Sequence, residues 1–182
     1  MLLSAGGSSA VALELTNTSA TAQVAVPVLI KVLDATGKTA YSNDTKGIEP
    51  SLQQLALLAP HASAWWVDNE VLANSVKSVT AAVGASTSTA PAQLPQIATS
   101  KISASASFPG PHVSATVTNH SKVAQTQLAV YAVVLKGSTV IGAGRGVVPK
   151  LAPSASASVL IPVIGGIDGR SIVLTAAPSS LR

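Results

Sequence analysis

The feature of this sequence that most constrains its fold is an internal repeat. Residues 11–19 read VALELTNTS and residues 113–121 read VSATVTNHS, so one alternation of apolar and polar residues ends twice in the same Thr-Asn-x-Ser turn. Further blocks match in the same order, namely 22–33 with 124–135, 58–63 with 151–156 and 80–82 with 175–177. Four matched blocks in one order indicate that a structural unit occurs twice.

Within each repeat the apolar residues are spaced two apart, as in residues 11–15 and 113–117. This period and the abundance of Val and Thr predict strands, whereas only residues 53–59 could form a helical turn. Glycines at 37 and 137 stand in polar turns between such segments, where hairpins need a positive φ. We therefore expect an all-β fold of two tandem immunoglobulin-like β-sandwiches.

The domain boundaries follow from the repeat and from one stretch of low apolar bulk. Residues 85–96 contain two prolines and several Ser and Thr, which indicates a linker between sandwiches at 1–84 and 97–182. Residues 97–107 read as the opening strand of the second sandwich. No equally long strand precedes Val11, so the first opening strand is expected to be short or to start upstream of Met1.

Composition and charge exclude several classes of protein. The 182 residues are 47% apolar and only 10% charged, which excludes a charge-rich disordered tail and a coiled coil. The net charge of +4 comes from 11 Lys and Arg against 7 Asp and Glu scattered along the chain, so no basic patch for nucleic acid is expected. With no cysteine there is neither a disulfide nor a thiolate metal site.

Nothing in the sequence predicts a membrane segment or a signal peptide. No run of about 20 apolar residues occurs, and residues 1–9 lack the basic and apolar regions of a signal peptide. Any membrane attachment would therefore depend on a segment that is absent from this chain.

Both repeats resemble the FxLYD-type immunoglobulin-like modules of bacterial envelope proteins. The resemblance rests on the Thr-Asn-x-Ser strand end, the long Val-rich strand, the glycine turn and the Leu-x-Pro-x-x-Ser corner, and on residues 131–136 in place of the FxLYD signature. It implies an extracytoplasmic protein that is anchored or secreted through an upstream segment. It implies no shared catalytic residue.

The inventory of chemical groups predicts no enzyme, no metal site and no cofactor. Serine is abundant, but no Gly-x-Ser-x-Gly elbow accompanies it. The glycines of residues 142–146 lack the Lys-Ser/Thr of a phosphate loop and indicate a glycine-rich strand or bulge. Asp168 is too isolated to build a calcium site. Asp68 and Glu70 would share one face of a strand, without other signs of a sugar cleft.

Three asparagines, Asn17, Asn43 and Asn119, match the N-glycosylation pattern. The repeated pair is interpreted more simply as turn residues that tolerate a left-handed φ.

Trp65 and Trp66 are adjacent in a chain with only 3% aromatic residues. Neighbours on a strand face opposite ways, so Trp66 should fill the first core, while Trp65 lies at the surface or against a neighbouring domain. Trp65 could pack beneath residues 43–54, which the second repeat lacks. The other hypothesis is a binding patch of Tyr41, Trp65, Asp68 and Glu70.

Three functions follow. The first is a non-catalytic extracytoplasmic envelope module, acting as a spacer or protein-interaction unit whose partner is another envelope protein. The second is a recognition module for cell-wall glycan or protein that uses the aromatic face around Trp65. The third is a pair of accessory domains from a larger enzyme.

Overall fold

The computed structural model describes residues 1–73, 75–86, 88–169 and 171–181. Over these ranges the chain consists of strands and a single 3-10 turn, η1, at Pro50–Leu52. This confirms the prediction of an all-β fold. Thr87, in the predicted linker, lies outside the described residues. The described residues form no helix that is long and apolar enough to cross a membrane.

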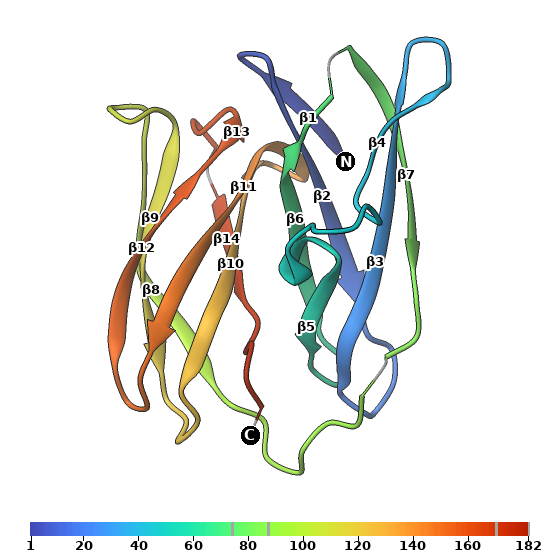
Figure 1. Cartoon of the computed structure of the whole chain (residues 1–182). Coiled ribbons are helices and arrows are strands. Elements are labelled where there is room, and N and C mark those ends of the chain that lie inside the picture. The colour runs from blue at the N-terminus through green and yellow to red at the C-terminus, as the bar shows by residue number, and fades with distance from the viewer. Residues whose placement is uncertain (74, 87, 170, 182) are drawn as a thin grey trace.

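The N-terminal half, residues 1–83, contains two facing sheets (Figure 1). The first sheet has the order β1-β2-β6 and comprises β1 (Leu2–Ala5), β2 (Ser8–Thr16) and β6 (Ser63–Val71). In the second sheet, β3 (Gln23–Asp34) pairs with three strands, β4 (Thr39–Ser42), β5 (Gln54–Leu58) and β7 (Val76–Val83). Every pairing in both sheets is antiparallel.

The C-terminal half, residues 97–177, repeats this arrangement. One sheet has the order β8-β9-β12 and comprises β8 (Ile97–Ser105), β9 (His112–Asn119) and β12 (Ser156–Pro162). The other has the order β13-β11-β10-β14 and comprises β10 (Gln125–Lys136), β11 (Thr139–Leu151), β13 (Ile164–Gly165) and β14 (Ser171–Ala176). Strands β8, β9, β10, β12 and β14 thus correspond to β1, β2, β3, β6 and β7.

The repeat extends to unusual backbone conformations. Ala25 in β3 and Gln127 in β10 stand at equivalent positions and have φ of 50° and 51°. His61 and Ser154, in the turns that precede β6 and β12, have φ of 49° and 57°. Non-glycine residues rarely adopt such values, so their recurrence shows that both halves follow one backbone path.

The halves differ where β11 runs without a break and its counterpart is split into β4 and β5. Residues 43–53 leave β3 at this point, and the side chain of Asn43 replaces the missing strand. Its Oδ1 accepts the N–H of Ile30 at 2.8 Å, and its Nδ2 donates to the carbonyl of Val28 at 2.8 Å. With an exposure of 1%, Asn43 is a structural residue rather than an accessible glycosylation site.

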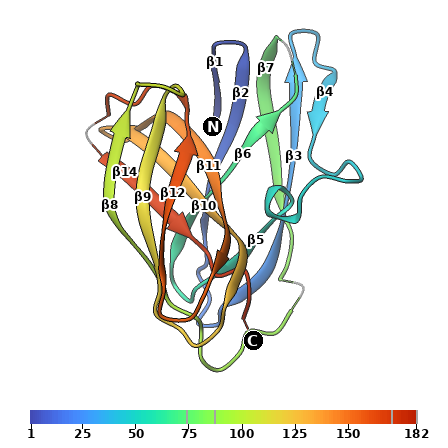
Figure 2. The ribbon, with the colours of Figure 1, turned by 60° about the vertical axis from the view of Figure 1, so that its left-hand side comes forward.

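The four sheets lie in layers, and the two inner layers pack against each other (Figures 1 and 2). Strand β10 is buried on both faces: Val130 and Val134 point into the core of the C-terminal half, whereas Tyr131 and Val133 join the core of the N-terminal half. One apolar cluster therefore spans the two halves and includes Ala12, Trp66 and Val67 beside residues of β10 and β11.

The glycines of residues 142–146 lie in β11, which confirms the prediction of a glycine-rich strand. A Cβ on Gly142 or Gly144 would overlap the carbonyl oxygens of Gly166 and Pro162, and one on Gly146 would lie 2.8 Å from the carbonyl oxygen of Leu160. The alternate glycines therefore let β11 approach β12 and the chain after it closely. The intervening side chains, including Arg145, face the N-terminal half.

Asn17, directly after β2, and Asn119, the last residue of β9, make the same hydrogen-bond network. Each Nδ2 donates to three carbonyls, those of Thr21, Leu58 and Ala59 for Asn17 and those of Val123, Leu151 and Ala152 for Asn119. Both are turn residues, as predicted, since their Oδ1 atoms accept the N–H of Ser19 and Ser121, but neither has the left-handed φ that the prediction allowed for. They act through buried side chains, with exposures of 6% and 0%.

Candidate functional site between the two halves

A bulge in β6 aims polar side chains at the C-terminal half. Ser9 pairs with Val71 and Val11 with Asp68, so Asn69 and Glu70 together stand opposite the single residue Ala10. The extra residue interrupts the alternation of the strand. Asp68 and Glu70 therefore do not share a face, contrary to the prediction from their spacing. Asp68 points into the core of the N-terminal half and Glu70 toward β11.

Arg145 of β11 is the residue that Glu70 meets. Its Nη2 donates to Glu70 Oε1 at 2.7 Å and to Glu49 Oε2 at 3.0 Å, while its Nη1 donates to Ser51 Oγ at 2.8 Å. The backbone carbonyl of Arg145 accepts from Asn69 Nδ2 at 3.3 Å. A single arginine thus joins β6 and residues 49–51 of the N-terminal half to the sheet β13-β11-β10-β14 of the C-terminal half.

The electrostatics of this cluster follow from partial burial. The Arg145 side chain is 4% exposed, against 39% and 58% for Glu49 and Glu70. Burial disfavours the charge of Arg145, but its hydrogen bonds to the two glutamates outweigh that effect and raise its pKa. Burial likewise opposes the charge of Glu49, but the hydrogen bonds from Arg145 and Ser51 lower the pKa of that carboxyl.

The carbonyl of Ser51 is a second junction. Trp66 Nε1 donates to it at 3.0 Å and the Tyr131 hydroxyl at 2.9 Å. Trp66 is fully buried, as predicted for the core residue of the pair. It is therefore Trp66, and not Trp65, whose side chain hydrogen-bonds to the segment absent from the second repeat.

Asp68 is buried in the core of the N-terminal half and paired there with Tyr41. The Tyr41 hydroxyl donates to Asp68 Oδ2 at 2.7 Å, and the Glu70 N–H donates to Oδ1 at 2.9 Å. Burial raises the pKa of Asp68, and the hydrogen bond from Tyr41 offsets this only in part. Burial and the nearby Asp68 carboxylate raise the pKa of Tyr41.

The four residues of the predicted binding patch lie on different surfaces. Tyr41 and Asp68 contact each other inside the N-terminal half, and Glu70 contacts Arg145. Trp65 is half-buried and packs against the shared apolar cluster, and its backbone N–H donates to Thr175 Oγ1 of β14 at 2.9 Å. This places Trp65 against the neighbouring half, one of the two locations predicted for it.

Arg145, Glu49, Ser51 and Tyr131 were not predicted as site residues. A sequence signal exists for Tyr131 alone: residues 128–135 are apolar without interruption, which is typical of a strand buried on both faces. Beside this cluster a groove of about 300 Å³ separates residues 49–56 from β10 and the residues after β14. Its lining includes Pro50, Ala129 and Tyr131.

The hydrogen bonds of this cluster hold segments of the two halves together. Arg145 is charged and paired through Nη2 with two carboxylates, and Asp68 is enclosed with its tyrosine partner. Within the part of the chain that the structure describes, no group of three or more His, Cys, Asp or Glu side chains is placed to hold a metal ion.

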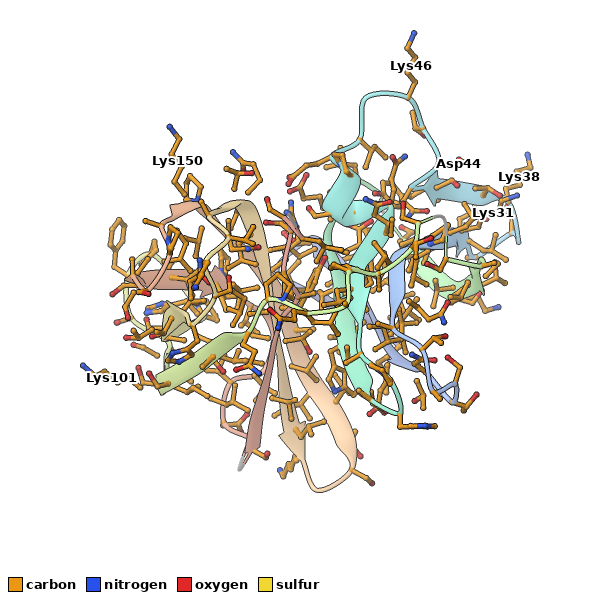
Figure 3. All side chains as sticks on the ribbon, turned by 90° about the horizontal axis from the view of Figure 1, so that it is seen from below. Lys31, Lys38, Asp44, Lys46, Lys101 and Lys150 are labelled. Carbon is orange, nitrogen blue, oxygen red and sulfur yellow. The ribbon has the colours of Figure 1, made fainter. Side chains whose placement is uncertain are left out.

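Eight lysines carry most of the remaining positive charge, and they are distributed over both halves. Lys31, Lys38 and Lys46 project from the N-terminal half, and Lys101 and Lys150 project from separate places on the C-terminal half (Figure 3). No family model and no curated protein matches the chain.

Proposed function

We propose that this chain is a non-catalytic extracytoplasmic module of the cell envelope, built as two tandem immunoglobulin-like sandwiches that act as a rigid spacer and protein-interaction unit. Residues 1–84 and 97–182 are the two sandwiches, and 85–96 connect them. The partner is another envelope protein.

The observation that carries the proposal is the packing between the halves. A flexible pair of modules would expose polar faces to each other, whereas here Tyr131 and Val133 enter the same apolar cluster as Ala12 and Val67. Arg145 adds hydrogen bonds to three residues across this contact. Such a unit holds a fixed length and direction, which is what a spacer or a platform for partner binding requires.

Two measurements test the proposal. Small-angle scattering of the full chain should give the dimensions of one rigid body, with the same profile from low to moderate salt. Protease added to cells should degrade the native protein before the cytoplasmic membrane is opened, either in intact cells or once any outer envelope layer has been made permeable. A scattering profile that needs an ensemble of half-to-half orientations contradicts the rigid unit, and complete protection until the cytoplasm is opened contradicts the location.

A further inference from the structure

The groove beside the Arg145 cluster has walls that belong to different halves, and we call it the inter-half groove. Residues 49–56 form one wall, and residues 126–131 of β10 form the other together with residues 177–179 after β14. Figure 1 shows the chain after β14 running between β10 and β5. A volume of about 300 Å³ places the groove at the lower end of the range of small-molecule sites, which often lie where two domains meet.

Both walls are held in place by hydrogen bonds within the chain. On one side, the carbonyl of Ser51 accepts from Trp66 Nε1 at 3.0 Å and from the Tyr131 hydroxyl at 2.9 Å. On the other side, the fully buried Gln125 accepts the N–H of Ser179 through its Oε1 at 2.9 Å. Walls that are fixed in this way lose little conformational freedom when a ligand binds, which favours affinity.

The surface between the walls is apolar. Ala129 and Ala177 are each 7% exposed, and Ala56 and the aromatic side chain of Tyr131 lie beside them. Three alanines leave space that longer side chains would fill. The volume of about 300 Å³ equals that of about ten waters at about 30 Å³ each, so the groove has room for an organic molecule of about ten non-hydrogen atoms.

Glu49 is the one charged side chain among the described residues that line the groove. Its Oε1 accepts from Ser51 Oγ at 2.9 Å and its Oε2 accepts from Arg145 Nη2 at 3.0 Å. A carboxylate has about four acceptor positions, so each oxygen can take a further hydrogen bond. The side chain is 39% exposed and can therefore be reached from the groove.

The charge around Glu49 is unbalanced. Arg145 contacts both Glu49 and Glu70, so two carboxylates share one guanidinium and the cluster has a net negative charge. Lys46 and Lys150 project away from the body of the protein (Figure 3), and neither lines the groove. A cationic group in the groove would complete the pairing of Glu49 through a charge-assisted hydrogen bond.

We propose that the inter-half groove binds a small organic cation, with a compact apolar body such as a phenyl ring and one primary ammonium group. The apolar body lies over Ala129 and Ala177, and the ammonium group donates to Glu49. The second repeat lacks residues that correspond to 43–53, so this wall of the site belongs to the first repeat alone. The inference adds a ligand site to the proposed spacer function and does not depend on it.

The probe is phenethylamine, titrated against the full chain. We expect saturable binding by calorimetry, with the largest amide chemical-shift changes in residues 49–56, 126–131 and 177–179. 2-Phenylethanol, which has a hydroxyl in place of the ammonium group, should bind at least about 10-fold more weakly because it lacks the charge. Ethylamine, which lacks the ring, should lose a similar factor because it buries little apolar surface.

A pair of charge-neutralising variants tests the role of Glu49. Glu49→Gln should weaken phenethylamine binding by about 10-fold and leave the binding of 2-phenylethanol unchanged. The matched control is Glu70→Gln, which removes the other carboxylate partner of Arg145 but lies outside the lining of the groove. The control should change phenethylamine binding by less than about 2-fold, because the lost charge is separated from the ligand and screened.

A second pair of variants tests the space. Ala56→Leu should weaken phenethylamine and 2-phenylethanol alike, by about 10-fold or more, because the added carbons occupy the groove. Ala56 alternates with the buried Leu55 and Leu57 and is itself only half-buried, so the core should stay intact. Ala81→Leu, at an exposed position of β7, is the control and should bind both probes like the parent chain.

Absence of saturable phenethylamine binding would overturn the inference, and so would equal affinities for phenethylamine and 2-phenylethanol. Equal losses in Glu49→Gln and Glu70→Gln, unchanged binding to Ala56→Leu, or chemical-shift changes centred elsewhere would each overturn it as well. None of these results alters the scattering or the protease accessibility, so the proposed rigid module is tested separately.

Discussion

The hydroxyl of Tyr131 and the indole N–H of Trp66 donate to one and the same carbonyl oxygen, that of Ser51, from opposite halves of the chain. Both donors are buried, with exposures of 2% and 0%. A carbonyl oxygen has two lone pairs, so both bonds form together. The turn at Pro50–Leu52 therefore fixes the two halves with its backbone as well as with its side chains.

This shared acceptor predicts non-additive substitutions. Tyr131→Phe alone should cost about 1 kcal/mol of unfolding free energy, because Trp66 still satisfies the carbonyl. Trp66→Phe alone adds a packing loss. The double variant should lose about 1 kcal/mol more than the sum, since the Ser51 carbonyl is then without a donor. Urea denaturation of the four proteins measures the coupling, and a sum that is strictly additive would contradict it.

Arg145 should be the most sensitive charged residue. Arg145→Met removes three hydrogen bonds and leaves Glu49 and Glu70 without their partner, at an expected cost of about 1–3 kcal/mol, moderated because both carboxylates are more than a third exposed. Lys150→Met, at an exposed position of the same strand, should change stability by less than about 0.5 kcal/mol. Equal effects of the two substitutions would show that the ion pairs contribute nothing.

Gly144→Ala should be severely destabilising, by about 3 kcal/mol or more, because its Cβ would overlap the carbonyl oxygen of Pro162 and the backbone has no free rotamer with which to yield. The matched control is Gly137→Asn, at a turn with a φ of 64° and nothing within 4 Å of the added Cβ, where Asn should cost under about 1 kcal/mol. Thermal denaturation distinguishes the two, and a Gly144→Ala protein as stable as the control would contradict the close approach of the strands.

The equivalent asparagines offer a matched pair of substitutions. Asn17→Ala and Asn119→Ala each leave buried carbonyls without a donor and should each cost about 2–3 kcal/mol. Because the two halves share an apolar cluster, either substitution should shift a single unfolding transition rather than melt one half alone. Calorimetry tests this through the ratio of calorimetric to van't Hoff enthalpy, and two resolved transitions would contradict it.

The buried carboxyl of Asp68 predicts a pH dependence. Its pKa in the folded protein is raised above the ordinary value of 3.8, so the folded state binds its proton more tightly than the unfolded state. Its contribution to stability is therefore greatest below pH 3.8 and falls as the pH rises through the folded pKa. Asp68→Asn should remove that fall, and denaturation midpoints between about pH 4 and 7 compare the two proteins. Parallel pH profiles would contradict the raised pKa.

Much of the fold was predictable because strand periodicity and turn chemistry are local properties. The repeat predicted which segments would be strands, and Trp66 was correctly assigned to the core from its alternation. Asp68 and Glu70 show where such reasoning ends. A bulge is an insertion relative to the partner strand, so the spacing of the two residues in β6 alone contains no sign of it.

The contact between the halves was harder to predict, although a signal existed. Residues 128–135 are wholly apolar, while the matching residues 26–33 contain Lys31. That contrast distinguishes a strand covered on both faces from one with a face in water. What no pattern shows is which distant segment covers the second face, so Arg145 and its glutamate partners could not be assigned in advance.

The packing of unlike faces has a consequence for polymerisation. The β1-β2-β6 face of the first half meets the β10-β11 face of the second, a head-to-tail contact that identical copies could repeat without end. At the two outer faces the corresponding positions are altered: Ser114 stands where Ala12 stands in the contact, and Lys31 where Val133 stands. A serine and a lysine at these positions make the two outer faces less suited to the same apolar contact, which disfavours its repetition into a filament.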